Sequence, residues 1–168
     1  MSESLETFAD LFEYDRWANR RVLEKLQAAE PIEDSREVDG RGEDADGASG
    51  LEEAVRLYSH LLRASDVWYA RIGGAGPGPT DRLWTPFDRD RLDLETARVA
   101  DRWDRFLSEI DEEALGREIE YENSSGTPYA HPLSGILRHL VNHGTYHRGQ
   151  IARVLSEATG DPPVTDYI

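Results

Sequence analysis

Cysteine is absent from the 168-residue chain, and its absence removes several kinds of chemistry at once. A chain without thiols forms no disulfide, offers no thiolate ligand to a metal and carries no thiol nucleophile of its own. Any metal site in this protein must therefore be built from His, Asp and Glu side chains.

Long apolar runs are also absent. No segment approaches the ~18 continuous apolar residues of a membrane-spanning helix, and the N-terminus lacks the basic region and apolar run of a signal peptide. We therefore expect no membrane partner and a cytoplasmic location.

Lysine is nearly absent, because Lys25 is the one lysine among 19 basic residues, against 34 acidic residues and a net charge of −15. This charge argues against nucleic acid as a partner, since binding to phosphates needs a basic surface. An acid-rich, lysine-poor surface is typical of a halophilic protein, because salt screens the repulsion among carboxylates. A GC-rich genome would also favour arginine codons, but it does not account for the acidic residues.

Hydrophobic residues make up 38% of the chain, which suffices for one domain over residues 1–168 that buries roughly 70% of its unfolded surface. Apolar side chains recur at steps of three and four residues in four stretches, which predicts four helices. These are Ser4–Ala29, Leu51–Ile72, Leu92–Ile110 and a stretch from just after Pro132 to Thr159.

The segments between these helices are rich in helix-breaking residues. Residues 33–50 form an acidic, glycine-rich stretch that predicts a flexible linker, and "GGAGPGPT" follows Ile72. A short alternating stretch around Ile119 and Tyr121 predicts a strand or hairpin before the last helix. The fold class expected is all-α, a single four-helix bundle.

Histidines recur in the last helix, in "HLVNHGTYHRGQIARVL". His143 and His147 are four residues apart, which places their side chains next to each other on one face of the helix, close enough to share a cation. Two ligands hold a metal poorly, and His60 on the second helix faces the bundle and is the candidate for a third. Three neutral imidazoles would leave coordination positions open, as in a catalytic site.

The alternative is that these histidines are packing residues that form hydrogen bonds in the interior. Two further histidines fit the pattern less well, because His139 faces more toward solvent and His131 lies in a proline-flanked loop. Gly144 costs the helix ~1 kcal/mol relative to alanine, which predicts that another group packs closely against the backbone there.

Polar side chains also occur on the apolar stripe of the first helix. Asp15 and Asn19 either form hydrogen bonds across the bundle or line a polar pocket, where they would orient the imidazoles. Arg148 is interpreted as a solvated charge paired with a carboxylate, and the alternative is that it meets an anionic group at the mouth of the site.

Three stretches together resemble the DinB family of damage-inducible, metal-binding four-helix bundles, which includes bacillithiol- and mycothiol-dependent S-transferases. They are "YDRWANRRVLEKL", "HLLRASDVWYARI" and "NHGTYHRGQI", and the C-terminal "PPVTDYI" is also similar. The resemblance spans nearly the whole chain apart from the acidic linker. It implies an up-down-down-up bundle with a long crossover, and a homodimer.

The resemblance also implies a function. The metal ligands of the family fall on His60, His143 and His147, which would hold one divalent transition metal ion, Zn²⁺ or Ni²⁺, with Fe²⁺ also compatible. The expected activity is metal-dependent transfer of a low-molecular-weight thiol onto an electrophilic small molecule, or a related detoxification. Two alternatives remain: a metal-dependent hydrolase that uses metal-bound water, and a non-catalytic metal-binding stress protein.

Overall fold

Four long α-helices form the body of the protein in the computed structural model, which describes residues 4–30, 46–74, 78–123 and 125–168, and side chains of the second helix from residue 50 onward. The predicted all-α four-helix fold is confirmed. The helices are α1 (Leu5–Ala28), α2 (Asp46–Ile72), α3 (Leu92–Glu109) and α4 (Leu133–Thr159).

A capping residue marks the N-terminus of α1, and another marks the C-terminus of α4. Ser4 precedes α1 and its hydroxyl oxygen accepts the backbone N–H of Thr7 at 3.2 Å, as expected of an N-cap. Gly160 follows α4 with φ +71°, the left-handed conformation that glycine adopts at a helix C-terminus.

The start of α2 differs from the prediction. Residues 46–50, expected to belong to the linker, are helical, and the rest of that linker, 33–45, lies outside the described residues. Gly50 lies against α4, where a Cβ on it would come within 2.8 Å of the Ala158 Cβ. Close packing of small residues on α4 thus outweighs the low helix propensity of this glycine-containing stretch.

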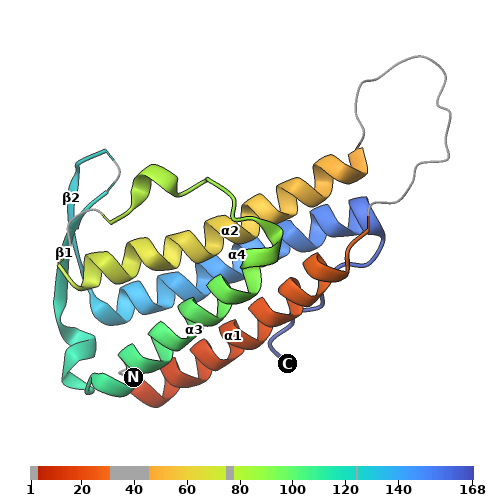
Figure 1. Cartoon of the computed structure of the whole chain (residues 1–168). Coiled ribbons are helices and arrows are strands. Elements are labelled where there is room, and N and C mark those ends of the chain that lie inside the picture. The colour runs from red at the N-terminus through yellow and green to blue at the C-terminus, as the bar shows by residue number, and fades with distance from the viewer. Residues whose placement is uncertain (1–3, 31–45, 75–77, 124) are drawn as a thin grey trace, which may run out of the picture.

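The chain direction reverses twice along the bundle (Figure 1). The helices α1 and α4 run one way, whereas α2 and α3 run the other way, which is the up-down-down-up topology. The segment after α2, described from residue 78, returns along α2 before α3 begins, and includes the short 3₁₀ helices η1 (Thr80–Arg82) and η2 (Arg89–Arg91). This segment is the long crossover.

A β-hairpin closes the end of the bundle where α4 begins, as the alternating sequence predicts (Figure 1). A 3₁₀ turn, η3 (Glu113–Gly116), leads into β1 (Glu118–Glu122), which pairs antiparallel with β2 (Pro128–Pro132). Tyr121 of β1 meets Trp68 of α2 edge to face at 4.9 Å, so the hairpin is anchored to the helices.

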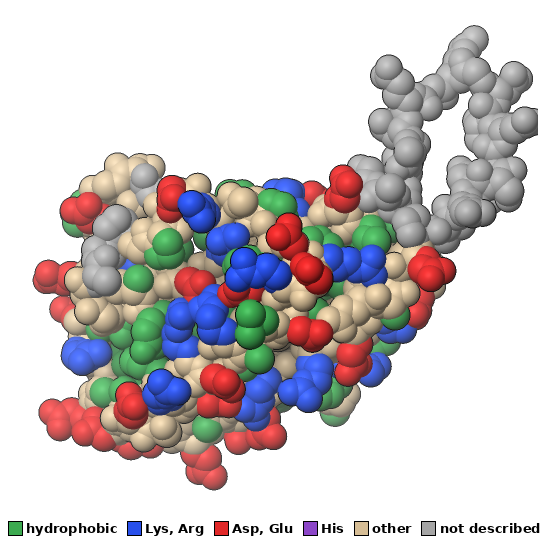
Figure 2. Space-filling model, viewed as in Figure 1, with side chains coloured by type: hydrophobic (Ala, Val, Ile, Leu, Met, Phe, Trp, Pro, Cys, Tyr) green, Lys and Arg blue, Asp and Glu red, His purple; other side chains and the backbone are tan. Residues whose placement is uncertain are grey.

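The largest helix–helix interface lies between α2 and α4, the two helices that carry the predicted site. Acidic and basic side chains alternate over the face shown in Figure 2, without a large field of one sign. Among the described residues, no helix has the length and apolar character needed to span a membrane.

Candidate metal centre

Three histidines meet between α2 and α4. His60 lies on α2, and His143 and His147 lie one turn apart on α4. Each offers a ring nitrogen that lies within 4.8 Å of the others, and the ring centroids are 4.4 Å apart for His143–His147 and 4.6 Å for His60–His147. Nitrogens this close together could hold a single metal ion.

The crossover segment fixes the ring of His60. Its Nδ1 lies 3.2 Å from the backbone carbonyl oxygen of Leu83, which only accepts, so Nδ1 carries the hydrogen and Nε2 keeps its lone pair. The indole of Trp84 stacks on the same imidazole at 3.6 Å with an interplanar angle of 9°. The two neighbouring residues thus set both the tautomer and the plane of His60.

A side-chain amide fixes His147 in the same way. The Nδ1–H of His147 donates to Oε1 of Gln150 at 2.7 Å, which again leaves Nε2 with a lone pair. The Nε2 of Gln150 in turn donates to the hydroxyl oxygen of Tyr146 at 3.1 Å. Hydrogen bonds from ligating imidazoles to such acceptors are typical of metal sites.

The ring of His143 has a buried Nε2 atom without a hydrogen-bond partner among the described residues. A buried polar atom without a hydrogen-bond partner lowers the stability of the fold by ~1–3 kcal/mol, so a partner for this nitrogen is expected. A metal ion shared with His60 and His147 would supply one. The donor set therefore fits a divalent ion of the kind that imidazole prefers.

The electrostatics of the cluster favour neutral imidazoles. Burial, and next the charge of His147, lower the pKa of His60 to about 4, and burial followed by the neighbouring histidines lowers the pKa of His143 to about 3. Burial also lowers the pKa of His147. Neutral rings keep the lone pairs that a metal needs, so at neutral pH the cluster is ready to bind.

The remaining histidines lie outside the cluster. His139 is exposed, in agreement with its predicted orientation toward solvent. Its ring stacks on His143 at 5.5 Å and meets Trp68 edge to face at 5.1 Å. His131 lies exposed on β2, where its Nδ1 is 3.2 Å from the Tyr121 hydroxyl. The sequence predicted a proline-flanked loop at His131, whereas the residue lies on a strand of the hairpin.

The interpretation of Arg148 as a solvated charge is wrong, and so is its placement at the mouth of the site. Arg148 is 1% exposed in the bundle, where its Nη1 donates to the Asp15 carboxylate and, at 2.9 Å, to Oδ1 of Asn19. Its Nη2 donates to the Thr145 hydroxyl at 3.0 Å. A partly buried carboxylate and a buried amide on α1 thus pair with Nη1 of Arg148, whereas its Nε is buried without a partner among the described residues. The periodicity of α4 alone does not reveal these partners on α1.

Asp15 and Asn19 form hydrogen bonds across the bundle, and both also line the small cavity described below. No hydrogen bond among the described residues joins either side chain to an imidazole nitrogen of the cluster. Burial raises the pKa of Asp15, and the neighbouring Arg148 opposes that rise. The predicted close approach at Gly144 is also present: a Cβ there would lie 2.6 Å from Oδ1 of Asp15 and 2.8 Å from Nη1 of Arg148.

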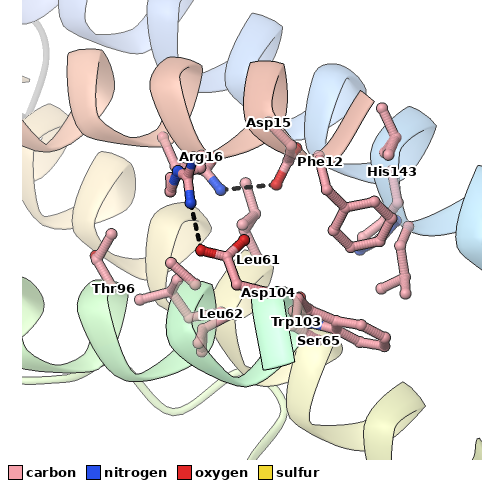
Figure 3. Close-up of a pocket in the computed structure, with 16 residues that line it drawn as sticks. Phe12, Asp15, Arg16, Leu61, Leu62, Ser65, Thr96, Trp103, Asp104 and His143 are labelled. Atoms are coloured by element: carbon pink, nitrogen blue, oxygen red, sulfur yellow. Dashed lines mark hydrogen bonds and ion pairs between the residues drawn. The ribbon is translucent and has the colours of Figure 1, made fainter. Parts of the chain in front are cut away.

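A small cavity of about 40 Å³ lies beside this network, and His143 is one of the residues that line it (Figure 3). Asp15 and Trp103 also line the cavity, and the indole Nε1 of Trp103 is buried without a partner among the described residues. The ion pair between Arg16 and Asp104 lies at its wall (Figure 3). The cavity exceeds the ~10–15 Å³ that one water needs, so it can hold solvent but no substrate.

Sequence reasoning missed the residues that hold the cluster. Gln150 lies three residues after His147, a spacing that could have indicated the contact on one helix face. Leu83 and Trp84 carry no such signal, because they approach His60 from a loop more than 20 residues away in the chain.

The family assignment agrees with this geometry. The DinB family matches the chain over residues 1–168. The chain belongs to the DinB family. It is similar to a curated relative, "Protein DinB" of Bacillus subtilis (strain 168), with 24% identity over 164 residues that cover 94% of this chain and 89% of the relative. The protein is thus DinB-like, with a histidine cluster that could hold a metal ion.

Proposed function

We propose that this DinB-family protein binds one divalent transition metal ion through His60, His143 and His147 and uses it to transfer a low-molecular-weight thiol onto an electrophile. The unpartnered, buried Nε2 of His143, beside two imidazoles whose Nδ1 atoms are already engaged, carries the proposal. The Nε2 lone pairs of His60 and His147, together with Nε2 of His143 in the tautomer that carries its hydrogen on Nδ1, would then serve one shared ion, Zn²⁺ or Ni²⁺, with Fe²⁺ also compatible.

The cluster would leave coordination positions of such an ion open to other molecules. Among the described residues the cluster contains three protein ligands, whereas a closed structural zinc site has four. A divalent ion with open positions lowers the pKa of a thiol or water bound there and so supplies a nucleophile at neutral pH.

The neighbouring residues have a positioning role in this proposal. The Leu83 carbonyl and the Gln150 amide hold the rings of His60 and His147 and increase their basicity. Trp84 covers one face of His60 and excludes water from it.

The choice of a thiol as the nucleophile rests on the likeness to the thiol-dependent transferases of the family. The chain has no cysteine, so a thiol would have to come from a cosubstrate. The aromatic side chains flanking His147, Trp84 and Tyr146, are 48% and 64% exposed and would contact the incoming molecules.

The test is transfer of a small thiol such as cysteamine to the electrophile monobromobimane by the metal-loaded protein. The metal-loaded wild type should accelerate transfer, the chelated protein and His143→Ala should not, and His139→Ala is the matched control because it replaces a neighbouring histidine outside the cluster. Equal rates with and without metal would refute the proposed transfer.

Two other outcomes would identify the alternatives. Metal-dependent cleavage of an activated ester without any effect of thiol would indicate a hydrolase. A large fall in melting temperature on chelation, with no reaction, would indicate a non-catalytic site that only stabilises the bundle.

We also propose that the protein is a homodimer. Trp17 on α1 and Val164 and Tyr167 in the C-terminal tail are 45%, 61% and 63% exposed. The ring of Tyr14 lies 6.1 Å from Trp17 and 4.9 Å from Tyr167, and its hydroxyl donates to the backbone carbonyl of Thr165, next to Val164, at 2.8 Å. An exposed apolar group of this kind, which we name the Trp17 patch (Tyr14, Trp17, Val164, Tyr167), suits a second copy of the chain.

A further inference from the structure

The crossover segment runs along α2 with little apolar packing of its own (Figure 1). No residue from Thr80 to Pro86 is buried. A segment with few buried apolar contacts separates from the fold at a low free-energy cost unless other interactions hold it. The two groups that contact His60, the Leu83 carbonyl and the Trp84 indole, both lie in this segment. The orientation of the His60 ring therefore depends on how the segment is held.

Two side chains of α2 hold the crossover segment. The Nε–H of Arg63 donates to the backbone carbonyl oxygen of Thr85 at 2.6 Å, and the guanidinium lies over the Phe87 ring at 3.9 Å. The hydroxyl oxygen of Ser59 accepts the backbone N–H of Phe87 at 2.9 Å. The hydroxyl hydrogen of Ser59 donates to the Val55 carbonyl oxygen at 2.7 Å, so its oxygen remains an acceptor for the segment. Each contact fixes the chain a few residues beyond the groups that contact the imidazole.

These two side chains lie beside the ligand His60 on α2. Arg63 is four residues after Ser59 and three residues after His60, so both are its neighbours on the helix surface. The segment also lies directly against α2 before it reaches His60, because a Cβ on Gly78 would come within 2.9 Å of the Val67 carbonyl oxygen. The segment is thus held to α2 on both sides of the residues that contact the imidazole.

We propose that Arg63 and Ser59 are positioning residues for the metal ligand His60 and act on it through the crossover segment. They keep the Leu83 carbonyl within reach of Nδ1, and this acceptor keeps the hydrogen on Nδ1 and the lone pair on Nε2. Among the described residues, neither side chain forms a hydrogen bond with an imidazole of the cluster. The inference rests on the proposed metal binding and deepens it by naming residues that set the metal affinity without contacting the ion.

The first experiment needs no metal, because it measures the tautomer of each histidine. Long-range proton–nitrogen NMR spectra distinguish a ring with its hydrogen on Nδ1 from a ring with its hydrogen on Nε2. In the metal-free wild type, His60 and His147 should both carry it on Nδ1, since each donates to an acceptor there. Arg63→Ala and Ser59→Ala should each shift His60 toward a mixture of the two forms. The ring of His147, which Gln150 holds instead, is the internal control and should not change.

The second experiment measures Zn²⁺ affinity by competition with a chromophoric chelator. Loss of the hydrogen-bond partner of a ligating imidazole weakens metal binding by about 10- to 100-fold. Arg63→Ala loosens that partner without removing it, so Zn²⁺ affinity should fall by about 3- to 10-fold. Arg63→Lys keeps a donor for the Thr85 carbonyl and should recover part of the loss. Arg153→Ala, at an exposed arginine of α4 that pairs with Glu157, is the control and should leave the affinity unchanged.

Hydrogen–deuterium exchange tests the same coupling from the other direction. Couplings between binding equilibria are reciprocal, so an ion that binds best when the segment is docked must also hold the segment on α2. The Phe87 amide, which donates to Ser59, should therefore exchange more slowly in the Zn²⁺-loaded wild type than in the metal-free protein. Equal exchange rates in the two forms would contradict the coupling.

The results separate the positioning role from the proposed function. An unchanged His60 tautomer in both Arg63→Ala and Ser59→Ala would overturn the proposal, and so would a wild-type Zn²⁺ affinity in Arg63→Ala. An equal change in His147 would also overturn it, since that would show a general disturbance of the bundle. If the wild type binds no Zn²⁺, the proposed metal function fails, whereas the tautomer of His60 still decides whether Arg63 and Ser59 position the ring.

Discussion

Gly144 is a position at which a single added methyl group should disturb the buried network between α1 and α4. In Gly144→Ala, the new Cβ would lie 2.6 Å from Oδ1 of Asp15 and 2.8 Å from Nη1 of Arg148. Both contacts are shorter than van der Waals distance, and Arg148 is 1% exposed, so the ion pair must move. Separating a buried ion pair costs several kcal/mol, and overpacking alone costs about 1–3 kcal/mol.

The higher helix propensity of alanine partly offsets this loss of stability, because alanine is favoured over glycine in a helix interior by about 1 kcal/mol. We therefore expect Gly144→Ala to lower the free energy of unfolding by about 1–3 kcal/mol, and the melting temperature by roughly 2–10 °C for a chain of this size. Denaturant unfolding followed by circular dichroism measures the difference.

Gly149→Ala is the matched control on the same helix. Gly149 is exposed, and a Cβ there would meet nothing within 4 Å, so only the gain in helix propensity remains. This variant should be about 0.5–1 kcal/mol more stable than the wild type. If Gly144→Ala is as stable as Gly149→Ala, the close approach of Asp15 and Arg148 to α4 does not limit this position, and the reasoning fails.

Three further predictions concern pH, salt and assembly. Because the pKa values of His60 and His143 fall to about 4 and about 3 on folding, against about 6.5 in an unfolded chain, the unfolded state binds more protons in this range. The metal-free protein should thus lose stability as the pH falls from 6.5 to 4, and denaturant titrations should show a shallower loss in His143→Gln. With a net charge of −15, the free energy of unfolding should rise between dilute buffer and molar salt; equal stability in both would contradict the halophilic interpretation. Sedimentation equilibrium should show a dimer that Trp17→Glu converts to monomer, while the same change at the exposed Leu94 of α3 leaves it intact.

The helices could be predicted from the sequence because each carries a long apolar period. The period of α4 also places His143 and His147 on one face, and the breaker after Ile72 ends α2 where expected. The start of α2 was predicted too late, since residues such as Gly50 are helical through contact with Ala158 on another helix. Local propensity contains no information about that partner.

The network around Arg148 could be predicted only in part. The apolar stripe of α1 shows that Asp15 and Asn19 need partners, and Gly144 indicates a close approach on α4. Neither pattern identifies Arg148 as the partner. Most arginines of this chain are expected on the surface, and the contacts of Arg148 with Asp15 and Asn19 form only once α1 and α4 pack together. The hydrogen bond from His60 to Leu83 is hidden for the same reason, since it depends on the path of the crossover.

The central claim is that three histidines from two helices hold one metal ion. Mass spectrometry of metal content per chain tests it most directly, on the wild type, on His60→Ala, His143→Ala and His147→Ala, and on His139→Ala as the control. We predict about one Zn²⁺ or Ni²⁺ per chain in the wild type and the control, and a loss of that metal in each of the three cluster variants while circular dichroism still shows a helical fold. Full metal content in His60→Ala, or no metal in the wild type after incubation with either ion, would contradict the account.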